Sequence, residues 1–310
     1  MPRATPTRRE EERPKCRPQI VASLLSLADG VKSREAALPR RKVCVRVACR
    51  PCTAARAGCG GGWRRRWPQT PVVLGKRFMR ILAIDTSELV GSVAALSDGN
   101  VLAENKLPHD QGSAQSLAPA IARLLDTVAW KAAEVQAVAV TDGPGSFTGL
   151  RVGVTTAGVF AYSVKAEVLA IDTLEAIAAA CPAEVDRVAV AMDAQRGQVV
   201  AVSFQRGSDG WFSPEGPWQL ADFDAWLAGL PDGIAVTGPV LHRASQELPA
   251  HLRVLPSQYW SPTASAVGRL AARRIARGER DDLWTVSPRY SRRSAAEEKW
   301  ERTQQAKDRG

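Results

Sequence analysis

One pattern occurs twice in this sequence and restricts its fold more than any other feature. Residues 80–85 form a short apolar run that ends in Asp85, and residues 187–193 form another that ends in Asp193. A turn and a further apolar run follow each of them. Short apolar runs bounded by turn residues predict buried strands. Because the order strand, aspartate, turn and strand recurs, the sequence predicts two copies of one lobe.

Strands and helices alternate along residues 79–310. The predicted strands are 80–85, 91–96, 101–107, 135–140, 167–171, 187–193, 199–204, 234–237 and 252–255. The predicted helices are 116–130, 146–163, 173–180, 222–228, 240–247 and 263–277. This alternation predicts an α/β fold with a mixed sheet and helices on both faces in each lobe. We expect the lobes to span residues 79–181 and 182–310.

Residues 1–78 differ from the rest of the chain in composition. They carry 19 Lys/Arg against 5 Asp/Glu, whereas residues 79–310 carry 23 against 27. They show no helical or strand periodicity, so we expect a disordered basic extension, produced by a start codon placed too far upstream of Met79. A basic nucleic-acid-binding arm is an alternative. The Cys44, Cys49, Cys52 and Cys59 cluster is interpreted as chance spacing, because no folded element surrounds it.

The remaining 232 residues contain a single cysteine, Cys181, which excludes a disulfide framework there and is typical of a reducing compartment. No apolar run approaches the ~20 residues of a membrane span. We therefore expect a cytoplasmic protein without a membrane contact.

The two aspartate turns and a glycine-rich segment are the candidate ligand site. Two lobes with acidic turns that face a cleft are the plan of the actin, sugar-kinase and Hsp70 ATPases. Here no glycine follows Asp85, so capping of its own turn by hydrogen bonds is an alternative role for this side chain. A vestigial nucleotide or anion site would comprise Asp85, Thr86, Gly143, Gly145, Ser146 and Asp193.

Small residues recur every four positions on the helix that follows the glycine-rich turn. Gly149, Gly153 and Ala157 form a ridge along one face, which permits close approach of another element. Each glycine costs ~1 kcal/mol of helix stability relative to alanine, so close packing must compensate. Leu117, Ile121 and Leu124 form the apolar face of the preceding helix. These six residues are the candidate partner interface.

Four blocks of this sequence resemble the TsaB (YeaZ) family of tRNA threonylcarbamoyladenosine proteins. They are residues 80–87, the segment Gly143–Gly153 (GPGSFTGLRVG), residues 192–198, and a closing segment at 288–297. The resemblance covers essentially all of residues 79–310 and implies an actin-like, ribonuclease H-like duplicated fold. Nothing before Met79 takes part in it.

The resemblance implies an accessory role rather than catalysis. It implies a non-catalytic subunit that pairs with a TsaD-like catalytic subunit through the first two long helices, joins a TsaE-like ATPase, and contacts tRNA only through the complex. ATP and metal would then belong to the partners, this chain would have no metal or cofactor of its own, and a homodimer would be possible when it is alone. TsaD-like proteins carry two metal-binding histidines at positions that match Thr173 and Ile177 here. Neither residue provides an imidazole ligand.

Two enzymatic alternatives remain open at this point. A small-molecule kinase or ATPase of the actin-like superfamily is favoured by Asp85 and Asp193 but disfavoured by the missing turn glycine. A metallopeptidase of the glycoprotease class is disfavoured by the missing histidine pair.

Overall fold

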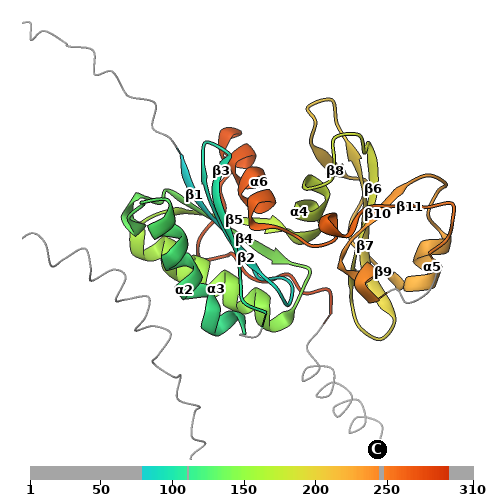
Figure 1. The fold of residues 1–310 in the computed structure, drawn as a ribbon, viewed down its shortest axis with the longest axis horizontal. Helices are drawn as coiled ribbons and strands as arrows, with labels where there is room; N and C mark the ends of the chain where they lie inside the picture. The colour runs from blue at the N-terminus through green and yellow to red at the C-terminus, as the bar shows by residue number, and fades with distance from the viewer. Residues whose placement is uncertain (1–78, 110–111, 244–247, 293–310) are drawn as a thin grey trace, which may run out of the picture.

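The repeated strands form the centres of two sheets that lie in separate lobes (Figure 1). The structure is a computed structural model that describes residues 79–109, 112–243 and 248–292. The predictions of disorder and of a misplaced start for residues 1–78 fall outside the described residues, as does the part of the closing segment after residue 292.

The first lobe contains a five-stranded mixed sheet in the order β3-β2-β1-β4-β5. Strand β2 pairs antiparallel with β1 and β3, whereas β4 is parallel to β1 and β5 is parallel to β4. Its strands are β1 (Arg80–Asp85), β2 (Ser92–Ser97), β3 (Asn100–Lys106), β4 (Ala137–Gly143) and β5 (Glu167–Asp172). Asp98 and Gly99 join β2 to β3 and both have positive φ, as a tight hairpin turn requires.

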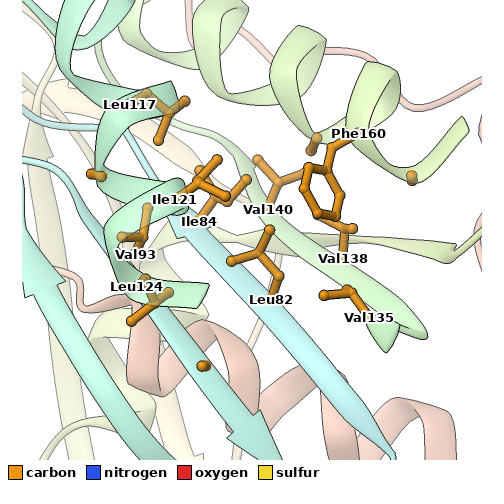
Figure 2. Packing of buried hydrophobic residues seen from close by; sticks show 14 of the residues in the cluster. Leu82, Ile84, Val93, Leu117, Ile121, Leu124, Val135, Val138, Val140 and Phe160 are labelled. Atoms are coloured by element: carbon orange, nitrogen blue, oxygen red, sulfur yellow. The ribbon is translucent and has the colours of Figure 1, made fainter. Parts of the chain in front are cut away.

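Alternate residues of β1 enter two different cores. Leu82 and Ile84 face helices α2 (Ser113–Thr127) and α3 (Phe147–Val164), as Figure 2 shows, and are fully buried. Ile81 and Ala83 face the opposite side, where α6 (Ala264–Ala276) covers the sheet. The strand is therefore buried on both faces, and this explains why its sequence is a continuous apolar run. The short 3₁₀ turn η1 (Ala132–Glu134) leads into β4.

The second lobe repeats this strand order as β11-β10-β6-β7-β8, with β9 also paired to β7. Its strands are β6 (Arg187–Asp193), β7 (Gln198–Arg206), β8 (Phe212–Pro214), β9 (Gln219–Asp222), β10 (Ala235–Thr237) and β11 (Arg253–Val254). One face packs on α4 (Thr173–Ala179), and the other packs on α5 (Phe223–Ala228) and the 3₁₀ helix η2 (Pro239–Arg243). A last 3₁₀ turn, η3 (Ser257–Tyr259), precedes α6. The predicted duplicated α/β architecture is confirmed.

Packing does not follow the lobe boundary expected at residue 181. Helix α4 precedes that boundary, yet Leu174 and Ile177 belong to the core of the second lobe. Helix α6 lies in the second half of the sequence, yet Val267 and Leu270 belong to the core of the first lobe. The reason is that an apolar helix face packs on whichever sheet is uncovered, and sequence order does not specify which one that is.

Most predicted elements agree with the structure to within a few residues at their ends. The predicted helix 240–247 is a 3₁₀ helix over residues 239–243, and residues 244–247 lie outside the described residues. Strands β8 and β9 were not predicted, because they are short and lack a period of two. Among the described residues, no helix combines the length and apolar content needed to cross a membrane.

Candidate functional site

A cleft of about 1310 Å³ lies between the two lobes. The turn after β1, the start of α3 and the turn after β6 contribute to its walls, together with Tyr290–Arg292 near the end of the described chain. Groups of both charges line it, including Glu88, Lys106, His109, Asp193, Arg196 and Arg292. Of the predicted ligand-site residues, Gly145, Ser146 and Asp193 line this cleft.

Asp85 and Thr86 do not line the cleft, because both are fully buried beneath the turn. The Oδ1 atom of Asp85 accepts hydrogen bonds from the backbone N–H of Ser87 at 3.1 Å, the Ser87 hydroxyl at 2.7 Å and the Thr141 hydroxyl at 2.9 Å. Its Oδ2 atom is buried without a hydrogen-bond partner. Burial raises the pKa of this carboxyl, although the bonds from Ser87 and Thr141 act in the opposite direction. Asp85 therefore caps the turn and does not reach a ligand in the cleft.

The corresponding turn in the second lobe is open to solvent. Asp193 is half-buried, and its Oδ1 atom accepts a hydrogen bond from the backbone N–H of Gln195 at 3.0 Å. Gln195 and Arg196 have positive φ, which is uncommon for residues other than glycine. Each turn thus has a capping aspartate, but only Asp193 lines the cleft.

The glycine-rich segment packs on the Asp85 turn. A Cβ atom on Gly149 would overlap the carbonyl oxygen of Thr86, and a Cβ on Gly153 would overlap the hydroxyl of the same residue. The Thr86 hydroxyl donates to the carbonyl oxygen of Gly149 at 2.8 Å. Ser146 caps α3 by accepting from the backbone N–H of Gly149 at 3.3 Å. The ridge therefore permits close approach of α3 to the turn of its own lobe.

The residues of the predicted partner interface lie within this packing. The six interface candidates are buried inside the first lobe, so their side chains are not available to another chain: Leu117, Ile121, Leu124, Gly149, Gly153 and Ala157. In the predicted anion site, the space beside Gly143 is filled by the same chain, because a Cβ atom at this position would overlap the carbonyl oxygen of Arg289. Helical periodicity identified a buried face correctly, but its neighbour is the sheet of the same lobe.

The two residues that match the metal-binding histidines of TsaD-like proteins also lie inside the protein. Thr173 and Ile177 are both fully buried, and Thr173 begins α4, whose N-cap is Asp172. Within the described residues, no three His, Cys, Asp or Glu side chains form a group that would hold a metal ion. That the chain has no metal of its own stays a prediction.

Two features of the site were not found from the sequence. Arg289 forms ion pairs with Asp142 and Asp172, beside Trp218 of the second lobe. On the outer surface of α3, Tyr162 stacks edge to face with Trp284 at 5.7 Å between ring centroids. The resemblance of residues 288–297 to the family's closing segment was the sequence feature that pointed to the region of Arg289. The Tyr162–Trp284 pair could not be predicted, because single aromatic residues do not show in the sequence which neighbours they meet.

The fold defines the class of this protein. Two lobes with the same strand order, in which a central strand has an antiparallel neighbour on one side and a parallel neighbour on the other, form an actin-like duplicated fold around a cleft. Two solved structures from Pseudomonas aeruginosa share it. One is titled YeaZ (27% identity, TM-score 0.57, covering 68% of this chain and 99% of that one). The other is described as similar to peptidase YEAZ (29% identity, TM-score 0.58, covering 69% and 100%).

Sequence comparisons find relatives of one kind. Residues 107–211 match the family model described as TsaD, tRNA N6-adenosine threonylcarbamoyltransferase. The tRNA threonylcarbamoyladenosine biosynthesis protein TsaB of Escherichia coli K12 is 35% identical over 141 residues, which are 44% of this chain and 60% of that protein. TsaB of Bacillus subtilis 168 is 34% identical over 127 residues, covering 41% and 56%. The chain is thus similar to proteins of the TsaB (YeaZ) family in sequence and in fold, and the matches span somewhat more than half the length of these curated relatives.

Proposed function

We propose that this chain is an accessory subunit of the complex that transfers threonylcarbamoyl to N6 of adenosine 37 in tRNAs that read ANN codons. The observation that carries the proposal is the 35% identity to a TsaB protein named for threonylcarbamoyladenosine biosynthesis. The match of residues 107–211 to the TsaD model adds support, because it indicates that this chain shares a lobe type with the transferase it would assist.

A non-catalytic role is supported by the environment of two positions. TsaD-like proteins are expected to hold their metal with histidines where this chain has Thr173 and Ile177, and both side chains are buried in α4. The kinase alternative is not favoured, because the Asp85 carboxylate lies beneath its turn, away from the cleft. The transferase chemistry, with its metal and ATP, would belong to a TsaD-like subunit and a TsaE-like ATPase.

We propose the exposed side of α3, rather than its buried ridge, as the surface that pairs with the TsaD-like subunit. Val159 is 43% exposed and Tyr162 is 65% exposed on this helix, while the neighbouring Trp284 is 79% exposed. Adjacent exposed apolar and aromatic side chains are typical of protein interaction surfaces. The same surface would support a homodimer when the partner is absent, and the complex would contact tRNA in the cytoplasm.

A complementation experiment tests the function. The full chain is supplied to cells depleted of their own TsaB, and threonylcarbamoyladenosine in bulk tRNA is measured by mass spectrometry together with co-purification of the TsaD-like protein. We expect the unmodified chain to restore the nucleoside. If it folds and is expressed but neither restores the nucleoside nor retains the TsaD-like protein, the proposed function is wrong.

Variants in the same cells test the surface separately. Tyr162→Asp and Trp284→Asp are expected to weaken binding of the TsaD-like protein about tenfold or more, since each places a charge in an apolar contact. Leu102→Asp is the matched control, because Leu102 is 51% exposed on β3, away from α3. Normal binding by both aromatic variants would place the pairing surface elsewhere and leave the function standing.

A further inference from the structure

The last described segment, residues 279–292, crosses the first lobe as a strap from the end of α6 to the cleft. At its start, the Asp281 carboxylate accepts hydrogen bonds from the backbone N–H of Ala170 at 2.8 Å and from Arg274 at 3.0 Å. Leu283 and Val286 then pack against the core shared by α2, α3 and the sheet. The strap is therefore fixed to the first lobe before it reaches the cleft.

Near the cleft, Arg289 joins the strap to the end of β4. Its guanidinium donates to both carboxylate oxygens of Asp142, at 2.7 and 2.6 Å, and its backbone N–H donates to the Asp142 carbonyl at 2.6 Å. Gly143 is required here, because any side chain at this position would overlap the carbonyl oxygen of Arg289. Such a bidentate pair is stronger and more directional than a single charged contact.

Arg289 also reaches the point where the chain passes from one lobe to the other. Asp172 ends β5 and caps α4, since its Oδ1 atom accepts from the backbone N–H groups of Leu174 at 2.8 Å and Glu175 at 3.1 Å. Its Oδ2 atom accepts from the indole N–H of Trp218 in the second lobe at 2.8 Å and from Arg289 at 3.3 Å. One carboxylate thus joins the crossover helix, the second lobe and the strap.

The aromatic ring of Trp218 completes this junction. The Arg289 guanidinium lies 4.8 Å from the Trp218 ring centroid, so it contacts the second lobe directly as well as through Asp172. The side chain of Asp142 is only 9% exposed and that of Asp172 is 20% exposed. Arg289 itself is 47% exposed, so solvent screens its charge in part. Removal of Arg289 would leave two neighbouring, mostly buried carboxylates without this compensating charge.

Beyond Arg289 the strap forms part of the cleft wall. The Tyr290 ring stacks on Phe147 at the start of α3, 4.5 Å between centroids, and its hydroxyl accepts a hydrogen bond from Arg151 at 2.8 Å. Tyr290, Ser291 and Arg292 line the cleft. A movement of the strap would consequently change both the junction at Asp172 and the surface of the cleft.

We propose that residues 288–292 hold the two lobes in a fixed relative position through the contact of Arg289 with Asp172, the residue at which the chain crosses between them. We call this crossover the hinge and the Arg289 contact the hinge lock. With Arg289 in place, Asp172 holds α4 and Trp218 together, and the lobes keep the relative position seen here. Withdrawal of Arg289 frees α4 to pivot, so that the cleft widens. The hinge lock goes beyond the proposed accessory function and does not depend on it.

Hydrogen–deuterium exchange of the full chain, measured by mass spectrometry, tests the hinge lock. Arg289→Ala is expected to raise the amide exchange rate about tenfold or more at the first turn of α4 (173–176), around Trp218 and at the amide of residue 289 within the 288–292 segment, whose N–H donates to the Asp142 carbonyl. This is the effect expected for loss of a charge-assisted hydrogen bond. Exchange in β1 and α2 should not change. Arg280→Ala is the matched control. Arg280 lies on the same strap, but it pairs with Glu167, at the opposite end of β5 from Asp172.

Two further variants distinguish the hinge lock from a merely local effect. Trp218→Phe keeps a ring but removes the N–H that binds Asp172, so it should loosen α4 while residues 288–292 stay protected. Arg289→Lys keeps the charge but not the bidentate geometry, and should give an intermediate effect. If Arg289→Ala raises exchange only in residues 288–292, Arg289 merely anchors the strap and the hinge lock is wrong. If it raises exchange throughout the first lobe, Arg289 stabilises the core of that lobe and the hinge lock is also wrong. The hinge lock is also wrong if Arg280→Ala loosens α4 as much as Arg289→Ala does.

Discussion

The substitution Gly149→Ala tests whether α3 packs closely against the turn that contains Thr86. In Gly149→Ala, the new methyl group would overlap the carbonyl oxygen of Thr86, and a backbone atom in a buried turn cannot rotate away as a side chain can. The helix must therefore move, which also strains the hydrogen bond from the Thr86 hydroxyl to the carbonyl of residue 149, now 2.8 Å long.

The free-energy terms oppose each other and can be compared. Overpacking of a core costs ~1–3 kcal/mol, and loss of a buried hydrogen bond costs about 1 kcal/mol. Alanine returns at most ~1 kcal/mol of helix propensity, and less in the first turn of a helix. We expect Gly149→Ala to destabilise the fold by roughly 2 kcal/mol, which lowers the melting temperature by about 4–8 °C for a folded part of this size.

Gly158→Ala is the matched control on the same helix. Its methyl group would meet only the Cδ1 atom of Leu283, at 3.9 Å, which is ordinary van der Waals contact. Here the gain in helix propensity is not opposed, so we expect stabilisation of up to ~1 kcal/mol. Both free energies of unfolding are measured by urea titration monitored by circular dichroism. If Gly149→Ala stabilises the chain as Gly158→Ala does, the close approach of α3 to Thr86 is wrong.

Two predictions concern buried titratable groups. Burial raises the pKa of Asp85 in the folded chain, so the unfolded chain loses this proton at a lower pH than the folded chain does. The contribution of this carboxyl to stability therefore falls as pH rises, and it is smallest above the pKa of the folded state. The stability of Asp85→Asn relative to the unmodified chain should therefore increase as pH rises above the ordinary carboxyl range, by at most about 1.4 kcal/mol per pH unit, and become constant above the raised pKa of the folded state. Urea titrations from pH 4 upward measure this, and a pH-independent difference would contradict it. Burial also raises the pKa of Cys181 to about 12, so iodoacetamide at pH 8 should modify the peptide that contains Cys181 only after urea is added, and rapid labelling of the native chain would contradict its burial.

The strand framework could be predicted because its physical signal is local. Strands β1 and β6 are buried on both faces, and such strands are continuous apolar runs that end abruptly at a polar residue. Asp85 and Asp193 mark these ends in the sequence. The capping role of Asp85 was predictable for the same reason, since an aspartate that binds the backbone two residues later needs only local geometry.

Neighbours in space could not be predicted in the same way. The apolar face containing Leu117 and Ile121 was read correctly from its period, but a period reports that a face is buried and not what buries it. The exposed Tyr162 and Trp284 form the outer apolar surface, and they come from segments more than a hundred residues apart. The junction of Arg289 with Asp142 and Trp218 is equally non-local.

The duplication also extends further than the repeated aspartates, and its divergence explains the asymmetric cleft. In the first lobe, β4 ends at Gly143, and Pro144 and the long helix α3 follow. In the second lobe, Gly238 follows β10, and the short 3₁₀ helix η2 begins at Pro239.

Each of these glycines allows a close backbone approach, since a Cβ on Gly238 would overlap the carbonyl oxygen of Ala191 in β6. The surroundings of the two aspartates nevertheless differ. Helix α3 packs on Thr86 through Gly149 and Gly153, and Asp85 is fully buried, whereas the second lobe has the five-residue η2 at this place and Asp193 remains part of the cleft wall. A ligand or partner segment that enters the cleft therefore meets Asp193 itself on the second lobe. On the first lobe it meets residues 87–92, the start of α3 and the strap, with Asp85 buried beneath them.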